Sequence, residues 1–323
     1  MRYGRLLRAL GHRARVLEAW DGGRADVLIV LNAQRGARSI LRARRERPEL
    51  PIVVVVTGTD VYTHLGASAI MARALDAASR IVGLQSDCLR VLGPRWRPKS
   101  RAILQSYDGP RLPHRVSDAH FDFALLGHLR AEKDPFRAAL AARRLPAESR
   151  VRVLHAGKAL KPALGLRARS EGESNPRYRW LGPLSRRAAL TLLSKSRALI
   201  LSSRIEGGPG VFSEALALGV PILASRIPAS VSILSARHPG LFTAGNSAEL
   251  AALMRRAECE PRFLARLAAA SRRLAPQFEP AVERAAWKQL LAELQPVAAL
   301  RSRAVEPARR AGEARRSTTS PAR

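Results

Sequence analysis

The stretch Ser202–Ser225, which reads SSRIEGGPGVFSEALALGVPILAS, decides the fold expected for this chain. Together with the apolar residues before it, it predicts a buried strand over 198–203, a glycine-rich loop over 206–210, a helix over about 211–218 and a second buried strand. The loop backbone is open to close approach by a ligand, because glycine carries no Cβ. Pro221 prevents the helix from continuing. This order of elements is typical of a parallel α/β sheet.

Two carboxylates accompany the loop: Glu206 lies within it, and Glu214 follows on the helix. Free amides at a helix N-terminus favour a phosphate, and an ionised carboxylate accepts two hydrogen bonds from a vicinal diol. A nucleotide sugar needs both, since its diphosphate takes N–H donors and its hydroxyls take carboxylate acceptors. The alternative is a solvated loop residue beside a surface position on an amphipathic helix. The neighbouring glycines and strands favour a functional site.

Composition limits the class of protein. The chain has 323 residues, of which 46% are hydrophobic, enough for two domains of ordinary size. No apolar run approaches the roughly 18 residues that span a bilayer, and the first residues lack the apolar core of a secretory signal. We therefore expect a cytoplasmic protein without membrane insertion. Cys88, Cys259 and the seven histidines show no metal-ligand spacing, so we expect neither a metal nor a cofactor besides the substrates.

The formal charge of +30 indicates a protein that attracts anions. Nucleic acid is one candidate, since a basic face is the footprint of phosphate binding. Only 5% of the residues are aromatic, however, and the arginines are spread along the chain, which leaves few platforms for stacking on bases. We expect no nucleic-acid partner, because an anionic substrate would benefit equally from a positive field.

Apolar runs alternate with helical patterns along most of the chain, as in parallel sheets covered on both faces. A first series of strands is expected at 14–20, 27–31, 52–57, 81–84 and 102–105. A second series is expected at 123–126, 151–156, 178–181, 198–203, 222–225 and 240–243. Two doubly wound α/β domains follow from this order, and such folds bind ligands at the carboxyl ends of their strands.

Two motifs in the second series resemble those of the family 4 glycosyltransferases. The stretch from Glu206 to Glu214 resembles their Glu-x7-Glu motif, and 127–133, GHLRAEK, resembles their Gly-Arg-Leu-x-x-Glu-Lys segment. The resemblance implies the GT-B architecture of two facing Rossmann-like domains with an inter-domain cleft. It also implies that Lys133 meets the donor diphosphate, that Glu214 holds the nucleotide ribose and that Glu206, as a catalytic residue, contacts the transferred sugar.

The remaining donor-side residues come from the same two motifs. The backbone of the loop is expected to contact the donor at Gly207, Gly208 and Gly210. His128 stands where the family usually has arginine, so we assign Arg130 to the donor phosphates and count His128 as a candidate catalytic residue. The alternative for His128 is a residue at a strand end whose ring is satisfied by a carbonyl.

A narrower resemblance concerns the acceptor. The segment 57–62, TGTDVY, together with 203–208, SRIEGG, and 224–228, ASRIP, resembles the selenosugar synthases of selenoneine biosynthesis. This implies transfer of a sugar, typically N-acetylglucosamine, from a UDP-sugar to the selenium of selenophosphate. The products are a 1-selenosugar, UDP and phosphate, and a functional link to a selenophosphate synthetase is implied.

Four residues at the carboxyl end of a predicted strand line the expected acceptor side. Thr57, Gly58 and Thr59 are assigned to the acceptor, and Asp60 is a candidate catalytic residue that orients a basic neighbour or the sugar. The alternative is a turn in which Gly58 supplies backbone freedom and Asp60 caps the helix that follows.

The resemblance also divides the chain. The expected parts are an acceptor-side Rossmann-like domain over 1–110, a linker over 111–120, a nucleotide-sugar-binding domain over 121–278, a closing helix over 279–295 and a disordered, arginine-rich tail over 296–323. Enzymes of this architecture begin with a strand and a glycine-containing loop, whereas this chain begins within a helical pattern. A truncated start, with lowered stability or activity, is therefore expected.

Two other functions stay open at this point. The first keeps the fold and changes the acceptor to a polysaccharide, a lipid-linked sugar or another small molecule. The second is an arginine-rich nucleic-acid-binding protein on a degenerate transferase scaffold, which would bind RNA in a salt-dependent way without affinity for UDP.

Overall fold

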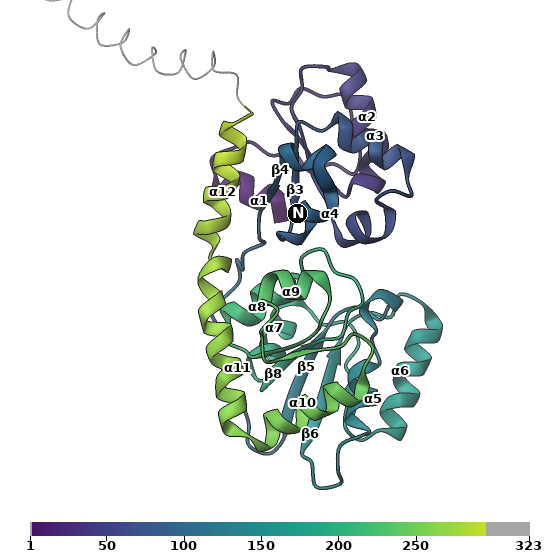
Figure 1. The fold of residues 1–323 in the computed structure, drawn as a ribbon, viewed down its shortest axis with the longest axis vertical. Coiled ribbons are helices and arrows are strands. Elements are labelled where there is room, and N and C mark those ends of the chain that lie inside the picture. The colour runs from purple at the N-terminus through teal and green to yellow at the C-terminus, as the bar shows by residue number, and fades with distance from the viewer. Residues whose placement is uncertain (1, 295–323) are drawn as a thin grey trace, which may run out of the picture. The chain divides into compact units, whose positions relative to one another are not determined.

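The computed structural model describes residues 2–294, so the tail predicted over 296–323 lies outside the described residues (Figure 1). The described residues fall into two units. One joins residues 2–15 to residues 284–294, and the other comprises residues 16–283 and contains two parallel β-sheets. Within residues 2–294, no helix combines the length and the apolar character that a membrane crossing requires.

The first sheet is parallel and has four strands in the order in which they occur in the chain. Its strands are β1 (Leu28–Leu31), β2 (Ile52–Val55), β3 (Arg80–Gly83) and β4 (Ser100–Ala102). The helices of this region are α2 (Ala33–Glu46), η1 (Asp60–His64), α3 (Ala69–Ala77), α4 (Asp87–Trp96) and η2 (Arg97–Lys99).

Strand β2 shows why this sheet forms. All four of its residues are fully buried, as expected for a continuous run of β-branched side chains in the interior of a parallel sheet. Ile52 and Val54, which point to the same face, share a core cluster with Ile40 of α2 and Leu75 of α3. The predicted alternation of strands and covering helices is therefore confirmed for this region.

The second sheet has six parallel strands in the order β10-β9-β8-β5-β6-β7. The strands are β5 (Phe121–Leu126), β6 (Val151–Ala156), β7 (Tyr178–Trp180), β8 (Ala198–Leu201), β9 (Ile222–Ser225) and β10 (Leu241–Phe242). Its helices are η3 (Ala131–Lys133), α5 (Arg137–Ala142), α6 (Pro162–Ser174), α7 (Arg186–Ser194), α8 (Gly210–Ala217), α9 (Pro228–Leu234), α10 (Ser247–Cys259), α11 (Pro261–Leu274) and η4 (Ala275–Phe278).

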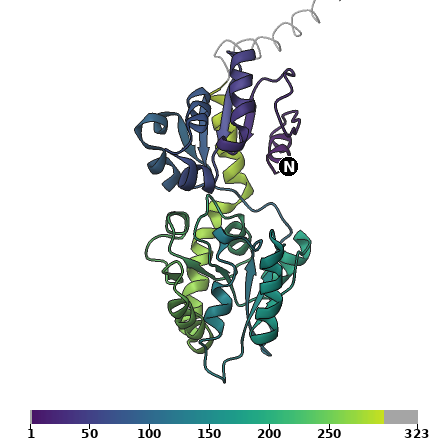
Figure 2. The same cartoon turned by 90° about the vertical axis from the view of Figure 1, so that its right-hand side faces the viewer.

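Both faces of the second sheet are covered, as Figure 2 shows. Phe123 and Ile200 belong to a core cluster built with α5, α10 and α11. Their chain neighbours Ala124 and Leu199 belong to another cluster, built with α7, α8 and α9. Because successive residues of a strand point to opposite faces, the two clusters lie on opposite sides of the sheet, which is the doubly wound arrangement predicted.

The strand order reverses between β5 and β8, and this reversal positions the site. From β5 the chain builds outward through β6 and β7, and it then returns to place β8 on the other side of β5. The loops after β5 and β8 therefore leave the sheet in opposite directions. Such a switch point is where open α/β sheets bind ligands.

The strand predicted over 14–20 is wrong. Residues 12–17 form no regular element, and of 14–20 only Trp20 is buried, whereas Val16 and Leu17 are 54% and 46% exposed. The apolar residues here are interrupted by Arg13 and Arg15, so no continuous face is available to bury. Within the described residues, β1 pairs with β2 alone and forms the edge of the first sheet.

Strand β4 begins and ends earlier than the predicted strand over 102–105. Ile103 still donates a backbone hydrogen bond to Gly83, at 2.9 Å, but the chain then leaves the sheet. Ser106 is held instead by Glu283, whose carboxylate accepts from the Ser106 backbone N–H at 2.8 Å and from its hydroxyl at 2.7 Å. A hydrogen-bonded side chain thus takes the place of the strand pairing where the chain leaves the sheet.

The remaining unit is small. It contains α1 (Arg2–Ala9) and the greater part of α12 (Pro280–Ala292). Trp287 is 1% exposed, and its ring meets the ring of Tyr3 edge-on at a centroid distance of 5.4 Å.

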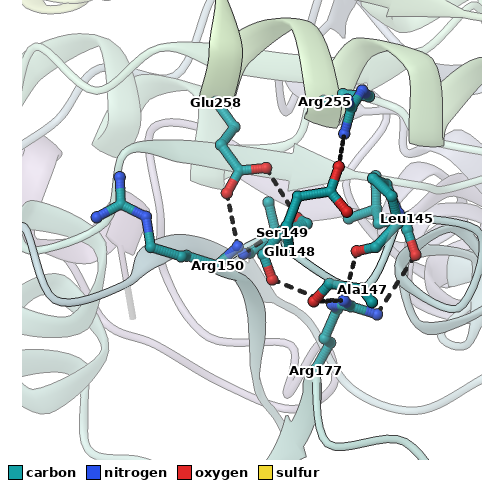
Figure 3. Close-up of polar contacts among 10 residues, drawn as sticks. Leu145, Ala147, Glu148, Ser149, Arg150, Arg177, Arg255 and Glu258 are labelled. Atoms are coloured by element: carbon teal, nitrogen blue, oxygen red, sulfur yellow. Dashed lines mark hydrogen bonds and ion pairs between the residues drawn. The ribbon is translucent and has the colours of Figure 1, made fainter.

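A polar cluster fixes the loop before β6, at the amino-terminal edge of the second sheet (Figure 3). Arg177 donates to the carbonyl oxygens of Pro146 and Ala147 at 2.7 and 3.1 Å. Glu258 accepts from the Ser149 hydroxyl at 2.8 Å and from the Arg150 backbone N–H at 2.7 Å. Because ligands bind at the carboxyl ends of parallel strands, this cluster stabilises the fold rather than the site.

Candidate functional site

A lysine and a glutamate meet at the switch point of the second sheet. Lys133 follows β5, and Glu206 follows β8; the Lys133 ammonium contacts Oε1 of Glu206. The Ser203 hydroxyl donates to the same oxygen at 2.6 Å. Oε2 of Glu206 has no hydrogen-bond partner among residues 2–294, so this oxygen is available to a ligand hydroxyl. Glu206 is only 8% exposed, which makes the ion pair largely buried.

Hydrogen bonds between the two loops hold this pair in place. The Arg204 backbone N–H donates to the Glu132 carbonyl at 2.8 Å. The Ser202 hydroxyl lies 3.0 Å from the Lys133 carbonyl and 3.1 Å from the Asp134 carbonyl. The loops after β5 and β8 are therefore one connected structure, which brings Lys133 and Glu206 together.

The other two candidate residues of the segment 127–133, His128 and Arg130, are more exposed. His128 accepts a hydrogen bond on Nδ1 from the Lys158 backbone N–H at 3.1 Å, which leaves Nε2 for a ligand. Arg130 is exposed. Gly157 packs against this loop so tightly that a Cβ would collide with the Gly127 carbonyl oxygen. A glycine is therefore required there for the loop to adopt its position.

His155 supports the same loop, a role that was not predicted because the residue lies within a predicted strand. The ring is fully buried, and its Nε2 lies 3.1 Å from the Gly127 carbonyl oxygen, while Nδ1 lies 2.9 Å from the Tyr178 hydroxyl. Burial lowers the pKa of His155 to about 4, so the ring is neutral at pH 7. Since a carbonyl only accepts, Nε2 carries the proton and the Tyr178 hydroxyl donates to Nδ1.

The glycines of the Glu206–Gly210 loop have a packing role. A Cβ on Gly208 would stand 2.5 Å from the Leu84 Cβ, and a Cβ on Gly207 would collide with the Gly58 backbone. Conversely, a Cβ on Gly58 would lie 2.5 Å from the Gly207 backbone nitrogen. The loop after β2 thus touches the loop after β8 backbone to backbone. Gly210, in contrast, is exposed and begins α8.

Glu214 lies in the middle of α8, near a guanidinium group. Its Oε1 is 3.9 Å from Nε of Arg186, and the Arg186 Nη2 lies 2.9 Å from Oδ1 of Asp108. Burial raises the pKa of Glu214, Arg186 opposes that rise, and Asp108 adds to it. Arg186 and Asp108 were not singled out from the sequence, since only the fold brings residues 108, 186 and 214 together.

Beside the first sheet, both carboxylate oxygens of Asp60 accept hydrogen bonds from nearby residues of the protein. Asp60 is 1% exposed, and its carboxylate accepts from the backbone N–H groups of Ala33 and Gln34, each at 3.1 Å. It also accepts from the Thr57 N–H at 2.8 Å and from the Thr57 hydroxyl at 3.0 Å. Asp60 therefore caps α2, the helix that precedes it in the chain, and not the helix that follows.

Asn32 links this network to Thr57 and Thr59, a role the sequence did not predict. It caps α2 with an unusual positive φ of 70°, and its Oδ1 accepts from the Arg35 N–H at 2.8 Å. Its Nδ2 donates to the Thr57 hydroxyl at 2.8 Å, while the Thr59 hydroxyl lies at 3.5 Å. The Thr57 hydroxyl donates to Asp60, so the Thr59 hydroxyl is the donor in the 3.3 Å contact between the two, a weak bond that a ligand acceptor can replace.

Comparison with known protein families agrees with this geometry. Residues 114–274, about half of the chain, match the family described as glycosyl transferases group 1. This segment is a glycosyltransferase group 1 domain. It contains both loops at the switch point of the second sheet, and with them Lys133, Glu206 and Glu214. No curated protein matches the chain in a sequence comparison.

Solved structures extend the comparison beyond the glycosyltransferase domain. HepE from Anabaena, in complex with UDP and glucose, superimposes with a TM-score of 0.71 at 16% identity, covering 91% of this chain and 89% of that one. Sucrose-phosphate synthase from Thermosynechococcus elongatus gives a TM-score of 0.69 at 16% identity, covering 83% and 73%. With two parallel α/β sheets and these structural neighbours, the predicted GT-B fold is confirmed.

Among residues 2–294, no three side chains of the His, Cys, Asp and Glu types come together as a metal ion would need.

Proposed function

We propose that this protein transfers a sugar, N-acetylglucosamine by preference, from a UDP-sugar to selenophosphate, giving a 1-selenosugar. The observation that carries the transferase part is the Lys133–Glu206 pair at the switch point, with Glu214 on the helix that follows. Two structural neighbours support the donor: HepE from Anabaena was solved with UDP-glucose, and pneumococcal GtfA with UDP and N-acetylglucosamine.

The donor chemistry follows from the charges at the site. The Lys133 ammonium neutralises negative charge on the diphosphate as the bond from the anomeric carbon to UDP breaks. The free Oε2 of Glu206 accepts a hydrogen bond from a sugar hydroxyl. Since Ser203 and Lys133 hold Oε1, the carboxylate is fixed in one orientation before the sugar arrives.

The acceptor side supports a nucleophile that needs no general base. An alcohol must lose a proton as it attacks, whereas selenophosphate attacks as an anion through selenium. Both oxygens of Asp60 already accept hydrogen bonds from the protein itself, so this carboxylate is not free to contact an acceptor hydroxyl. The Thr59 hydroxyl supplies a donor for the selenophosphate oxygens. Selenium attacks the anomeric carbon, UDP leaves, and water then takes the phosphoryl group from selenium as phosphate.

The test is mass spectrometry of a reaction that contains the protein, UDP-N-acetylglucosamine and freshly prepared selenophosphate. Glu206→Gln removes the charge of the sugar-binding carboxylate at nearly constant size, and Glu173→Gln is an exposed control on α6. We expect an N-acetylhexosamine product with the isotope pattern of selenium for the wild type and the control, and its loss for Glu206→Gln.

Two results would contradict this function in different ways. Transfer of the sugar from the UDP-sugar to a polysaccharide, a lipid-linked sugar or another small acceptor, with release of UDP and no selenium product, would keep the transferase and replace the acceptor. Salt-sensitive RNA binding without any affinity for UDP would contradict the transferase itself.

A further inference from the structure

The carboxylate of Glu214 is unusual in having a cation nearby that does not hydrogen-bond to it. The Arg186 Nε lies 3.9 Å from Oε1, beyond hydrogen-bonding distance, and no other side chain among residues 2–294 donates to either oxygen. Both oxygens are therefore open to a ligand, although three-quarters of the side chain is shielded from solvent. This suits a carboxylate that binds a diol, because each hydroxyl needs one free oxygen.

The guanidinium is held at that distance by a second carboxylate. The Arg186 Nη2 donates to Asp108 at 2.9 Å. The segment that carries Asp108 is itself anchored: the Tyr107 N–H donates to the Phe278 carbonyl at 3.1 Å, and the Tyr107 ring packs with Phe212 of α8. Asp108 thus fixes Arg186 relative to the same helix that carries Glu214.

We propose that Arg186 is a positioning residue, the counter-ion that keeps Glu214 ionised for the ribose of the donor, and that Asp108 holds it where it occupies neither oxygen of that carboxylate. This inference rests on the proposed function, in which Glu214 binds the nucleotide ribose. It assigns a role to a residue outside both sequence motifs.

The electrostatics of the site support the assignment. Burial raises the pKa of Glu214, and Asp108 adds to the rise, so an isolated Glu214 would protonate more readily than an exposed one. The groups that face it are Arg186, Asp108 and Tyr107, and burial also raises the pKa of Tyr107, which stays neutral. Arg186 is therefore the one positive charge among these groups.

The experiment compares the binding of UDP and 2′-deoxy-UDP by calorimetry at pH 6 and pH 8. Arg186→Gln removes the charge, Arg186→Lys keeps it, and Arg187→Gln removes an exposed charge from the next position of α7. The ionised carboxylate binds the diol, so affinity for UDP is present above the pKa of Glu214 and lost as the pH falls through it. Removal of Arg186 raises that pKa, and the loss begins at a higher pH.

We expect Arg186→Gln to weaken UDP binding on the order of tenfold at pH 6 and less at pH 8, with a smaller effect on 2′-deoxy-UDP. Arg186→Lys should keep a pH profile close to the wild type, and Arg187→Gln should change nothing. Equal losses for the two nucleotides at both pH values, or equal losses for the two arginine-to-glutamine variants, would overturn the inference. Failure of the wild type to bind UDP would instead contradict the proposed function on which it rests.

Discussion

Replacing Thr57 and Thr59 by valine, one at a time, separates a structural hydroxyl from a functional one. The Thr57 hydroxyl makes two good hydrogen bonds, to Asn32 at 2.8 Å and to Asp60 at 3.0 Å. The Thr59 hydroxyl has only contacts at 3.3 and 3.5 Å, to Thr57 and Asn32. Valine has nearly the same shape as threonine, so each variant removes one hydroxyl and little else.

The expected magnitudes follow from these distances. A hydrogen bond to a charged group contributes about 1.5–3 kcal/mol and a neutral one about 1 kcal/mol. Thr57→Val should therefore lower the free energy of unfolding by about 2–3 kcal/mol, since Asp60 keeps its three backbone donors. Thr59→Val should lower it by less than about 0.5 kcal/mol, because contacts beyond 3.2 Å are weak.

Two assays complete the comparison. Urea unfolding measures the stability of each variant, and initial rates measure the KM for selenophosphate and for the UDP-sugar. We expect Thr59→Val to raise the KM for selenophosphate about tenfold, because the variant loses one charge-assisted hydrogen bond to this substrate. The KM for the UDP-sugar should be unchanged. The reasoning is refuted if both variants lose the same stability, or if Thr59→Val binds selenophosphate normally.

Three further predictions concern the ion pair, the glycine contact and acid stability. Lys133→Ala should lower the free energy of unfolding by about 3 kcal/mol in urea denaturation, since it leaves Glu206 buried without a cation, and adding Glu206→Gln should restore part of that loss. Gly58→Ala should abolish transfer and lower the melting temperature in calorimetry, because its Cβ would meet the Gly207 backbone at 2.5 Å; an active, stable variant would contradict this contact. Burial lowers the pKa of His155 and of His238 to about 4, so the unfolded chain takes up their protons first as the pH falls below about 6.5. The free energy of unfolding should be highest above that pH and fall toward pH 4 by about 3 kcal/mol for each ring. A free energy of unfolding that stays constant over this range would contradict the prediction.

The sheets and the donor loops were predictable because they rest on local patterns. The strand predicted over 151–156 coincides with β6, in which buried and partly exposed residues alternate from Val151 to Leu154, as in a strand. The Lys133–Glu206 contact was predictable only through the resemblance, because the two residues lie 73 positions apart and meet through the reversal of strand order.

The residues that support the site, Asn32, Arg186 and His155, were not predictable because each acts on a residue that is distant in the sequence. Asn32 acts through Thr57, which is 25 positions away and becomes its neighbour only because β1 and β2 pair in parallel. Arg186 acts on Glu214 through the packing of α7 beside α8, and His155 has the pattern of an ordinary strand residue. The strand expected over 14–20 failed for a different reason, because charged residues interrupt its apolar ones and leave no continuous face to bury.

In the proposed reaction, the contact between Gly58 and Gly207 brings the acceptor side and the donor side together. Thr59 follows Gly58 directly, and Glu206 precedes Gly207 directly, so each functional side chain is one residue from the contact. Consecutive Cα atoms are about 3.8 Å apart, so the Cα atoms of Thr59 and Glu206 each lie only that far from the glycine that makes the backbone contact. A side chain at either glycine would separate the loops and move Thr59 away from Glu206. In the proposed reaction, these glycines would therefore set the distance between the acceptor-side hydroxyl of Thr59 and the carboxylate of Glu206.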